Sequence, residues 1–245
     1  MRPDANYEQA LDAFASGLLA TGGRFQDSFL PFQRKVAFYG ALNGLSQVLL
    51  KIACPGVPDF YQGAELWNFS MVDPDNRRPV DYRHRGELLD WLRSRESEGR
   101  AALAAELARE PQQEAAKMYV VWKALGFRRD HATLFSEGEY IPVAAGGAHP
   151  DCVVAFARRR AGEWALAVAP RWITRLHCTP PNLNSCNWGD TALQLPSGAP
   201  QKWTNIFTGV TGHVPSISEI LRDFPVALLE GLPAHEWHPA ASSGA

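Results

Sequence analysis

Apolar residues in the first half of the chain recur three or four positions apart, the spacing of helices that bury one face. Residues 5–20 form one such stretch, and the pair Gly22–Gly23 after it is a typical stop signal. Residues 31–53 form a longer stretch that begins with Pro31, a residue that fits the first turn of a helix. These patterns predict an amphipathic helix followed by a buried one.

Gly40 and Gly44 lie one turn apart within the second predicted helix. Each glycine costs a helix roughly 1 kcal/mol relative to alanine. We therefore expect another segment of backbone to pack closely against this face.

After the second helix, residues 57–61 read as a short strand bounded by glycines, and a long charged loop follows. The order of helix, turn, strand and loop is that of an α/β unit. Further helices are predicted at 85–95 and at 111–130, the latter opened by Pro111, with an alanine-rich polar segment between them.

From about residue 135 the hydrophobic period changes to that of short strands, separated by Gly, Pro, Asn and Asp. A long surface loop is expected at 177–190, and a short helix at 217–223. The predicted fold class is α+β, with a helical first half and an antiparallel, sandwich-like β domain. The predicted strands cover residues 140–145, 152–160, 163–172, 191–196, 202–207 and 224–230.

Charge and length narrow the possible partners. The 24 basic and 26 acidic residues nearly cancel, and the longest basic run is residues 158–160, which argues against nucleic acid and anionic membrane surfaces. Asp4 and Glu8 interrupt what would be the apolar core of a signal peptide, and we expect no later stretch to reach the ~18 apolar residues of a membrane span. The cytoplasm is the expected location.

The four cysteines are too few and too scattered for a disulfide framework or a zinc site. Cys178 and Cys186 are near enough in sequence to meet across a loop, but we expect them to be free thiols, like Cys54 and Cys152. The seven histidines show no metal-ligand spacing. No metal and no cofactor are predicted.

Residues 59–78 carry the side chains that hold sugars, namely carboxylates, arginines, amides and flat aromatic rings. A loop that follows a barrel strand lies where ligand sites form. A second interpretation is slightly favoured for the charges between 73 and 78, in which the aspartates Asp73 and Asp75 structure the loop through salt bridges to the arginines. The candidate sugar-binding residues are Asp59, Tyr61, Gln62, Glu65, Trp67, Arg77 and Arg78.

The stretch PGVPDFYQGAELWNFSMVDPDNRRPVDY, residues 55–82, resembles the segment around the eighth barrel strand of maltooligosyltrehalose synthases, members of the α-amylase-type glycoside hydrolase group. Residues 29–63 resemble the preceding helix together with this strand. The likeness covers nearly the whole chain, because four more stretches resemble the family's C-terminal region in order: 117–143, 153–159, 187–196 and 224–231.

The resemblance implies the last part of a (β/α)8 barrel in residues 1–95, a helical connector in 96–134 and a β domain in 135–235. The Pro-rich terminus, residues 236–245, is expected to be a disordered tail. The resemblance also implies an isomerase activity in trehalose biosynthesis, an intramolecular transglucosylation. The reducing-end α-1,4 bond of a maltooligosaccharide becomes an α,α-1,1 bond by a retaining carboxylate mechanism. Water must be excluded from the site, because otherwise hydrolysis would replace the transglucosylation.

In this group the three catalytic carboxylates follow barrel strands four, five and seven, and the chain resembles only what comes later. No catalytic residue is therefore assigned, and the chain is expected to be inactive alone. The expected partner is a maltooligosaccharide, bound together with the upstream part of the enzyme. An exposed barrel edge would also favour self-association unless helices cover it.

A second hypothesis is a non-catalytic carbohydrate-binding or assembly module. Aromatic faces bind pyranose rings, although core positions are the commoner use of tryptophan in a sandwich. The tryptophans that could form a sugar-stacking platform are Trp164, Trp172, Trp188 and Trp203.

Overall fold

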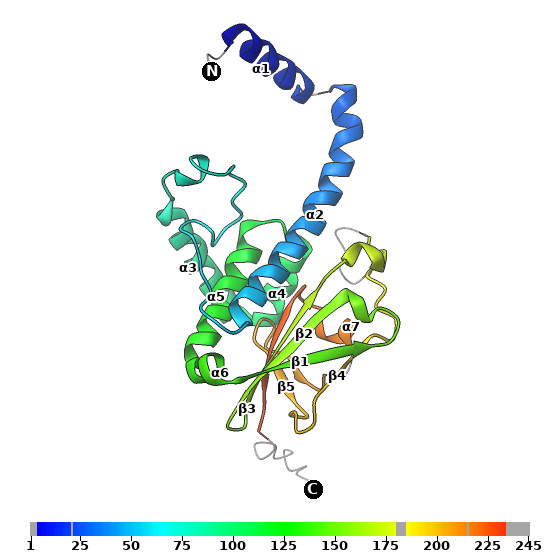
Figure 1. The fold of residues 1–245 in the computed structure, drawn as a ribbon. Helices are drawn as coiled ribbons and strands as arrows, with labels where there is room; N and C mark the ends of the chain where they lie inside the picture. Colours follow the sequence, from blue (N-terminus) through cyan, green and yellow to red (C-terminus); the bar gives the residue numbers. More distant parts are fainter. Residues whose placement is uncertain (1–3, 21, 180–184, 215, 234–245) are drawn as a thin grey trace.

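The computed structural model describes residues 4–20, 22–179, 185–214 and 216–233, and the predicted tail at 236–245 lies outside them. Helices fill the first half of the described chain and strands the second, as predicted (Figure 1). The helices are α1 (Ala5–Leu19), α2 (Arg24–Ala53), α3 (Tyr82–Glu98), α4 (Arg100–Arg109), α5 (Glu114–Asp130), α6 (Ala132–Glu137) and α7 (Ile217–Ile220). The strands are β1 (Glu139–Gly146), β2 (Val153–Arg160), β3 (Glu163–Pro170), β4 (Ala192–Gln194), β5 (Trp203–Asn205), β6 (Thr211–Gly212) and β7 (Ala227–Gly231).

Neither proline opens its helix. Helix α2 begins at Arg24 and contains Pro31, and α5 begins at Glu114, three residues after Pro111. The apolar positions 25, 29, 32 and 36 keep helical spacing through Pro31, so the amphipathic pattern extends α2 toward the N-terminus. As a result, α1 and the first half of α2 project away from the rest of the protein (Figure 1).

Residues 57–61 do not form the predicted strand, because they have no strand partner among the described residues. A barrel strand is defined by ladders to neighbours on both sides. The nearest chain to this segment is helical, and helices cannot supply such ladders. A strand at this position would therefore need a partner from outside the described chain.

The strands form one antiparallel sheet in the order β4-β1-β2-β3-β7-β5-β6, rather than the two packed sheets of a sandwich. Side chains alternate between its faces. Phe156 and Leu228 belong to a core shared with the helices, whereas Leu166 and its neighbour Leu229 belong to a second core on the other face. The helices thus cover one face, and the loops and α7 close the other together with Phe38 and Leu42 from the middle of α2.

Buried polar contacts join the helical half to the sheet. The Tyr119 hydroxyl on α5 donates to the Phe207 carbonyl at 2.6 Å, and the Ser46 hydroxyl on α2 donates to the Pro170 carbonyl at 2.8 Å. Burial raises the pKa of Tyr119 strongly, so its hydroxyl remains a donor. The two halves of the described chain therefore share one core.

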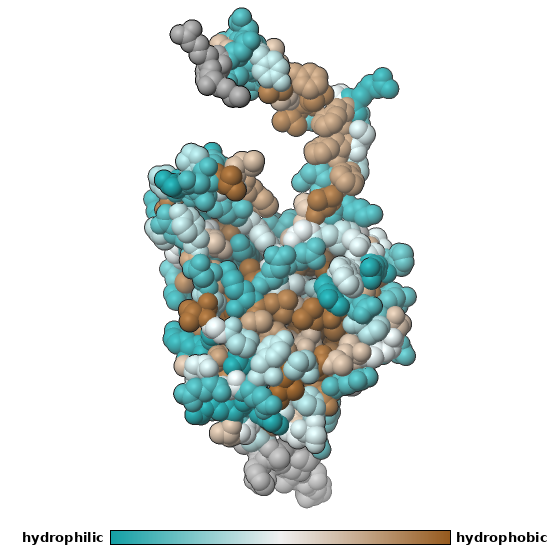
Figure 2. Space-filling model, in the orientation of Figure 1, coloured by the Kyte–Doolittle hydropathy of each residue, from teal (hydrophilic) through white to brown (hydrophobic). Residues whose placement is uncertain are grey.

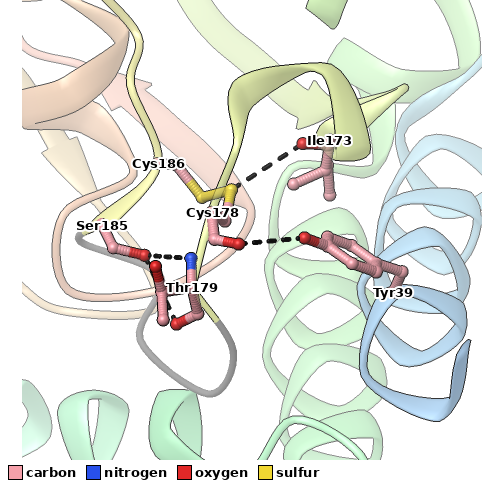
Figure 3. Close-up of a disulfide and its surroundings, with 6 residues drawn as sticks. All are labelled: Tyr39, Ile173, Cys178, Thr179, Ser185 and Cys186. Atoms are coloured by element: carbon pink, nitrogen blue, oxygen red, sulfur yellow. Dashed lines mark hydrogen bonds between the residues drawn. A yellow bond between two sulfur atoms is a disulfide. The ribbon is translucent and has the colours of Figure 1, made fainter. Parts of the chain in front are cut away.

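Cys178 and Cys186 form a disulfide, so the expectation of free thiols was wrong for this pair (Figure 3). The amide of Asn187 donates to the carbonyl of Leu176 at 3.0 Å, which brings the two ends of the loop together. The Tyr39 hydroxyl on α2 donates to the Cys178 carbonyl at 3.1 Å and fixes this loop against the helix. Cys54 and Cys152 are free thiols, and burial raises the pKa of both.

Helix α2 is long and apolar enough to cross a membrane by length and composition, contrary to the expectation that no stretch would be. Of its most apolar window, 56% is buried inside the protein, as in the core helix of a globular fold. Leu42, Leu45, Leu49 and Ile52 on its second half are fully buried.

Candidate functional site

The candidate site is the segment from Val57 to Arg78, which begins where α2 ends. Gly56 there has a φ of 99°, which reverses the chain at low cost because glycine lacks a Cβ. The Arg128 guanidinium on α5 donates to the carbonyl of Ile52 in the last turn of α2 and to those of Cys54 and Gly56 just past it. These contacts satisfy carbonyls that a helix end leaves unpaired and set where the segment starts.

The first part of the segment is held through its backbone, and its polar side chains face solvent. Lys51 donates to the Asp59 carbonyl at 2.8 Å, and its ammonium lies 3.7 Å from the centre of the Phe60 ring. The side chains of Asp59, Tyr61 and Gln62 are exposed, Tyr61 by 52%. This arrangement leaves a phenol, an amide and a carboxylate available on one short stretch.

Glu65 is held by an ion pair with Arg85 on α3, with Oε2 and Nε 3.1 Å apart. The same guanidinium donates to the carbonyls of Gly63, at 2.9 Å, and Asp81, at 3.0 Å. One partly buried arginine therefore joins both ends of the charged loop.

Trp67 packs inward. Its indole Nε1 donates to the Gln113 carbonyl at 3.1 Å, and its ring lies directly over Gly44 of α2. Lys117 donates to the Leu66 carbonyl at 2.8 Å and lies 4.9 Å from the centre of the Trp67 ring. Burial, with a smaller effect from the nearby Lys51, lowers the pKa of Lys117. Trp67 therefore anchors the loop to α2 and α5.

The close approach at Gly44 comes from this indole ring, not from the backbone predicted from the sequence, and at Gly40 no atom would lie within 4 Å of an added Cβ.

The paired substitutions Gly44→Ala and Gly40→Ala are expected to have opposite effects on stability. A Cβ at Gly44 would lie 2.6 Å from the ring, so Gly44→Ala should cost about 1–3 kcal/mol. Gly40→Ala should gain about 0.5–1 kcal/mol of helix propensity. Urea unfolding of both variants measures the difference, and equal shifts of the same sign would contradict this packing.

The charged loop carries two ion pairs between neighbouring residues, Asp73 with Arg77 and Asp75 with Arg78. Asp75 also accepts a hydrogen bond from the Met71 amide at 2.7 Å. The guanidinium groups of Arg77 and Arg78 are largely exposed. The aspartates thus shape the loop, and the arginines keep surface that a ligand can reach.

A groove of about 550 Å³ lies between the first half of α2 and the segment. Phe29, Phe32 and Val36 line it from α2, and Trp67 and Phe69 from the segment. Its lining is predominantly apolar. Within the described residues, no group of three or more His, Cys, Asp and Glu side chains could hold a metal ion.

His84 lies at the edge of the loop, with Nε2 2.7 Å from the Glu114 carboxylate. The hydrogen bond to Glu114 raises the pKa of His84. The carboxylate of Asp81 caps α3 by accepting from the His84 amide, which lowers the pKa of Asp81. This histidine therefore contributes to the junction of α3 and α5.

The tryptophans of the β half divide into core and surface. Trp164, Trp188 and Trp203 are buried, and Trp203 donates its indole hydrogen to the Pro200 carbonyl at 2.8 Å. Trp172 is exposed, and the guanidinium carbons of Arg171 and Arg175 each lie 4.3 Å from its ring centre. The four tryptophans do not form a common exposed platform.

No family model matches the chain. A curated protein of Mycobacterium tuberculosis is described as a maltooligosyl trehalose synthase in strains CDC 1551 and H37Rv. It is 40% identical to this chain over 189 residues. The match covers 76% of this chain and 20% of that protein. The solved structure of maltooligosyltrehalose synthase from Arthrobacter ramosus matches 95% of this chain and 27% of that one, with a TM-score of 0.74 at 31% identity. The chain is homologous to the C-terminal part of the maltooligosyltrehalose synthases.

Another maltooligosyl trehalose synthase structure matches 94% of this chain and 27% of its own, with a TM-score of 0.63 at 25% identity. The chain thus spans between 20% and 27% of the length of the synthases it matches. Because 95% of the chain is matched, the helical half and the sheet both correspond to parts of the synthase fold.

Several residues that position the site were not found from the sequence. Lys51, Arg85, Gln113, Lys117 and Arg128 hold the segment, but they lie up to 76 positions from the groups they contact. Nothing in the sequence around a basic residue on a helix indicates which distant carbonyl that residue will contact. The resemblance to the synthases located the segment but not its supports.

Proposed function

We propose that this chain supplies one wall of the glucan cleft, together with the β domain, of a maltooligosyltrehalose synthase. The observation that supports this most is the form of residues 57–67, a segment anchored by Lys51 and Lys117 on its backbone while Tyr61 and its polar neighbours remain exposed. A wall needs this combination of a rigid backbone and accessible side chains. The homology to the synthases supports a substrate of this kind.

In the proposed reaction, the complete synthase converts the reducing-end α-1,4 bond of a maltooligosaccharide into an α,α-1,1 bond, which makes it an isomerase. A retaining mechanism requires one carboxylate that attacks the anomeric carbon and one acid that protonates the leaving glucose. On this chain Glu65, Asp73 and Asp75 are engaged by arginines. Asp59 is not engaged in this way by any described residue, and the resemblance to the synthases makes it a wall residue. We therefore assign the catalytic carboxylates to the upstream part and propose that the chain alone is inactive.

The proposed sugar contacts differ in kind. Asp59, Tyr61 and Gln62 present exposed groups that can hydrogen-bond hydroxyls, and the Tyr61 ring offers a face for a pyranose. Arg77 and Arg78, fixed by their aspartates, lie over the subsite of the cleaved glucose and help retain it until it attacks again. Glu65 and Trp67 support the wall from inside and do not contact sugar, because their polar atoms already bond to Arg85 and Gln113.

The remaining assignments follow from this role. Residues 1–95 are the closing part of an α-amylase-type barrel, 96–134 a connector and 135–235 the β domain. The enzyme works in the cytoplasm on maltooligosaccharides, without a cofactor, nucleic acid or membrane. The alternative of a carbohydrate-binding module has less support, because three of the four tryptophans that suggested it are buried.

Co-expression with the upstream part of the Arthrobacter ramosus synthase tests the proposal, with maltopentaose as substrate and reducing ends as the readout. A trehalose terminus is non-reducing, so transglucosylation lowers the number of reducing ends, whereas hydrolysis raises it. We expect the pair to lower it and each part alone to leave it unchanged. A pair that forms a complex but never lowers the reducing-end count would overturn the proposed function.

A further inference from the structure

The arm is the projecting part of the helical half and comprises α1 and α2 as far as Val36. Its 15-residue helix α1 has no buried residue. A helix of this length is marginal in water unless its apolar face is packed. The arm nevertheless has abundant apolar surface, visible as brown atoms along its length in Figure 2.

The apolar side chains of the arm form a stripe. On α1 they recur at positions 7, 11 and 14, and on α2 at 25, 29, 32 and 36, all with helical spacing. Each of these side chains is exposed, Phe14 by 63% and Phe32 by 64%. On α2 the stripe lies on the opposite side of the helix from the face that Leu42 and Leu45 bury lower down.

The stripe runs into the 550 Å³ groove, whose far wall is Trp67 and Phe69. Phe69, Met71 and Val72 add further exposed apolar surface beside it, with Phe69 exposed by 88%. A groove with so little polar lining fits apolar side chains better than a polyhydroxylated sugar. Phe29, Phe32 and Val36 belong to both the stripe and the groove, so on α2 the two form one apolar surface.

The occupant of this surface follows from the comparison with the synthases. A match over 95% of this chain leaves about 12 of its 245 residues unmatched, fewer than the 15 residues of α1, so at least part of the arm has a counterpart in the synthase fold. That fold includes the other 73% of the Arthrobacter ramosus chain (100 − 27), which has no counterpart here. A surface adjoining the proposed cleft wall is where that part must meet this one.

We propose that the arm stripe and its groove are the docking surface for the upstream, barrel-forming part of the synthase. This inference rests on the proposed function, and it names the surface through which the two parts assemble. Apolar side chains of the upstream part fill the groove, cover Phe29 and Phe32, and thereby hold residues 57–67 against the cleft. Stripe residues are anchors of this interface, and charged residues on the other side of α2 are not.

The test compares Phe32→Asp with the matched control Arg34→Asp, which lies on the opposite side of the same helical turn. Both positions are exposed, so thermal unfolding of each variant alone should match that of the unchanged chain. Each is co-expressed with the tagged upstream part of the Arthrobacter ramosus synthase, and the affinity of the purified pair is measured without sugar. Phe14→Asp extends the test to α1.

We expect Phe32→Asp and Phe14→Asp to weaken the complex about tenfold or more, the ratio that a lost anchor worth roughly 1.4 kcal/mol gives. Arg34→Asp should leave the affinity unchanged.

Equal affinities for all variants, or the absence of any complex, would overturn the docking surface. A homodimer of this chain that Phe32→Asp dissociates, with no upstream complex, would overturn it in favour of a second copy. A complex that depends on Phe32 but yields no trehalose-ended product would leave the docking surface standing and refute the proposed function.

Discussion

Tyr119→Ala is expected to lower the free energy of unfolding by about 4 kcal/mol, the usual cost of emptying a buried aromatic site. Tyr119 is fully buried and packs against Phe207 and Phe224, so it lies where α5 meets the β half. Its loss also leaves the Phe207 carbonyl without its donor. Thermal unfolding should show one transition, lowered by about 10 °C for a chain of this size.

Two variants separate the contributions at this position. Tyr119→Phe keeps the ring and removes only the hydrogen bond, so it should cost about 1–2 kcal/mol. Tyr61→Ala removes a tyrosine that is 52% exposed and should change stability by less than about 0.5 kcal/mol. If Tyr119→Ala instead lowered only one of two separate transitions, the helical half and the sheet would be independent units, contrary to their shared core.

Arg85→Met is the second substitution with a large expected effect, about 2 kcal/mol of lost stability. It removes the partner of Glu65 and the donor to the carbonyls of Gly63 and Asp81. Breaking a fully buried ion pair by removing one partner costs about 3–5 kcal/mol. Here the side chains of Arg85 and Glu65 are 17% and 31% exposed, so solvent screens part of that cost.

Arg83→Met is the matched control, because Arg83 also pairs with a glutamate, Glu87, but on the surface with its side chain 87% exposed. This change should cost less than about 0.5 kcal/mol. Urea unfolding of both variants gives the comparison. A loss for Arg83→Met as large as that for Arg85→Met would mean that Arg85 does not hold the charged loop in the way described.

Local periodicity predicted most of the secondary structure. The strands of the β half other than β6 and the helices α1, α3 and α5 follow from patterns within ten to twenty residues, as does the second half of α2. The start of α2 was missed because Pro31 was taken as a helix opener. The strand predicted at 57–61 was wrong for a different reason: a strand depends on neighbouring strands, and the described chain supplies none at that position.

The candidate site shows the same division between local and distant contacts. The pairing of Asp73 and Asp75 with Arg77 and Arg78 was predicted from the sequence, where all four charges lie in one short loop, and both ion pairs are present. The supports from Arg85, Lys117 and Arg128 depend on how helices pack, which no local pattern reports. The disulfide between Cys178 and Cys186 was rejected because few cysteines and an expected cytoplasmic location favoured free thiols, whereas the loop geometry joins them.

The central claim is that residues 57–67 line a glucan cleft completed by the upstream part of a synthase. Hydrogen exchange of the co-expressed pair, measured with and without maltopentaose, tests it most directly, with cellopentaose as a control of equal length and β-1,4 linkage. We expect slower amide exchange across 57–67 and around Arg77 with maltopentaose only, and only when both parts are present. Slowed exchange confined to the β domain, or equally present in the chain alone, would contradict it.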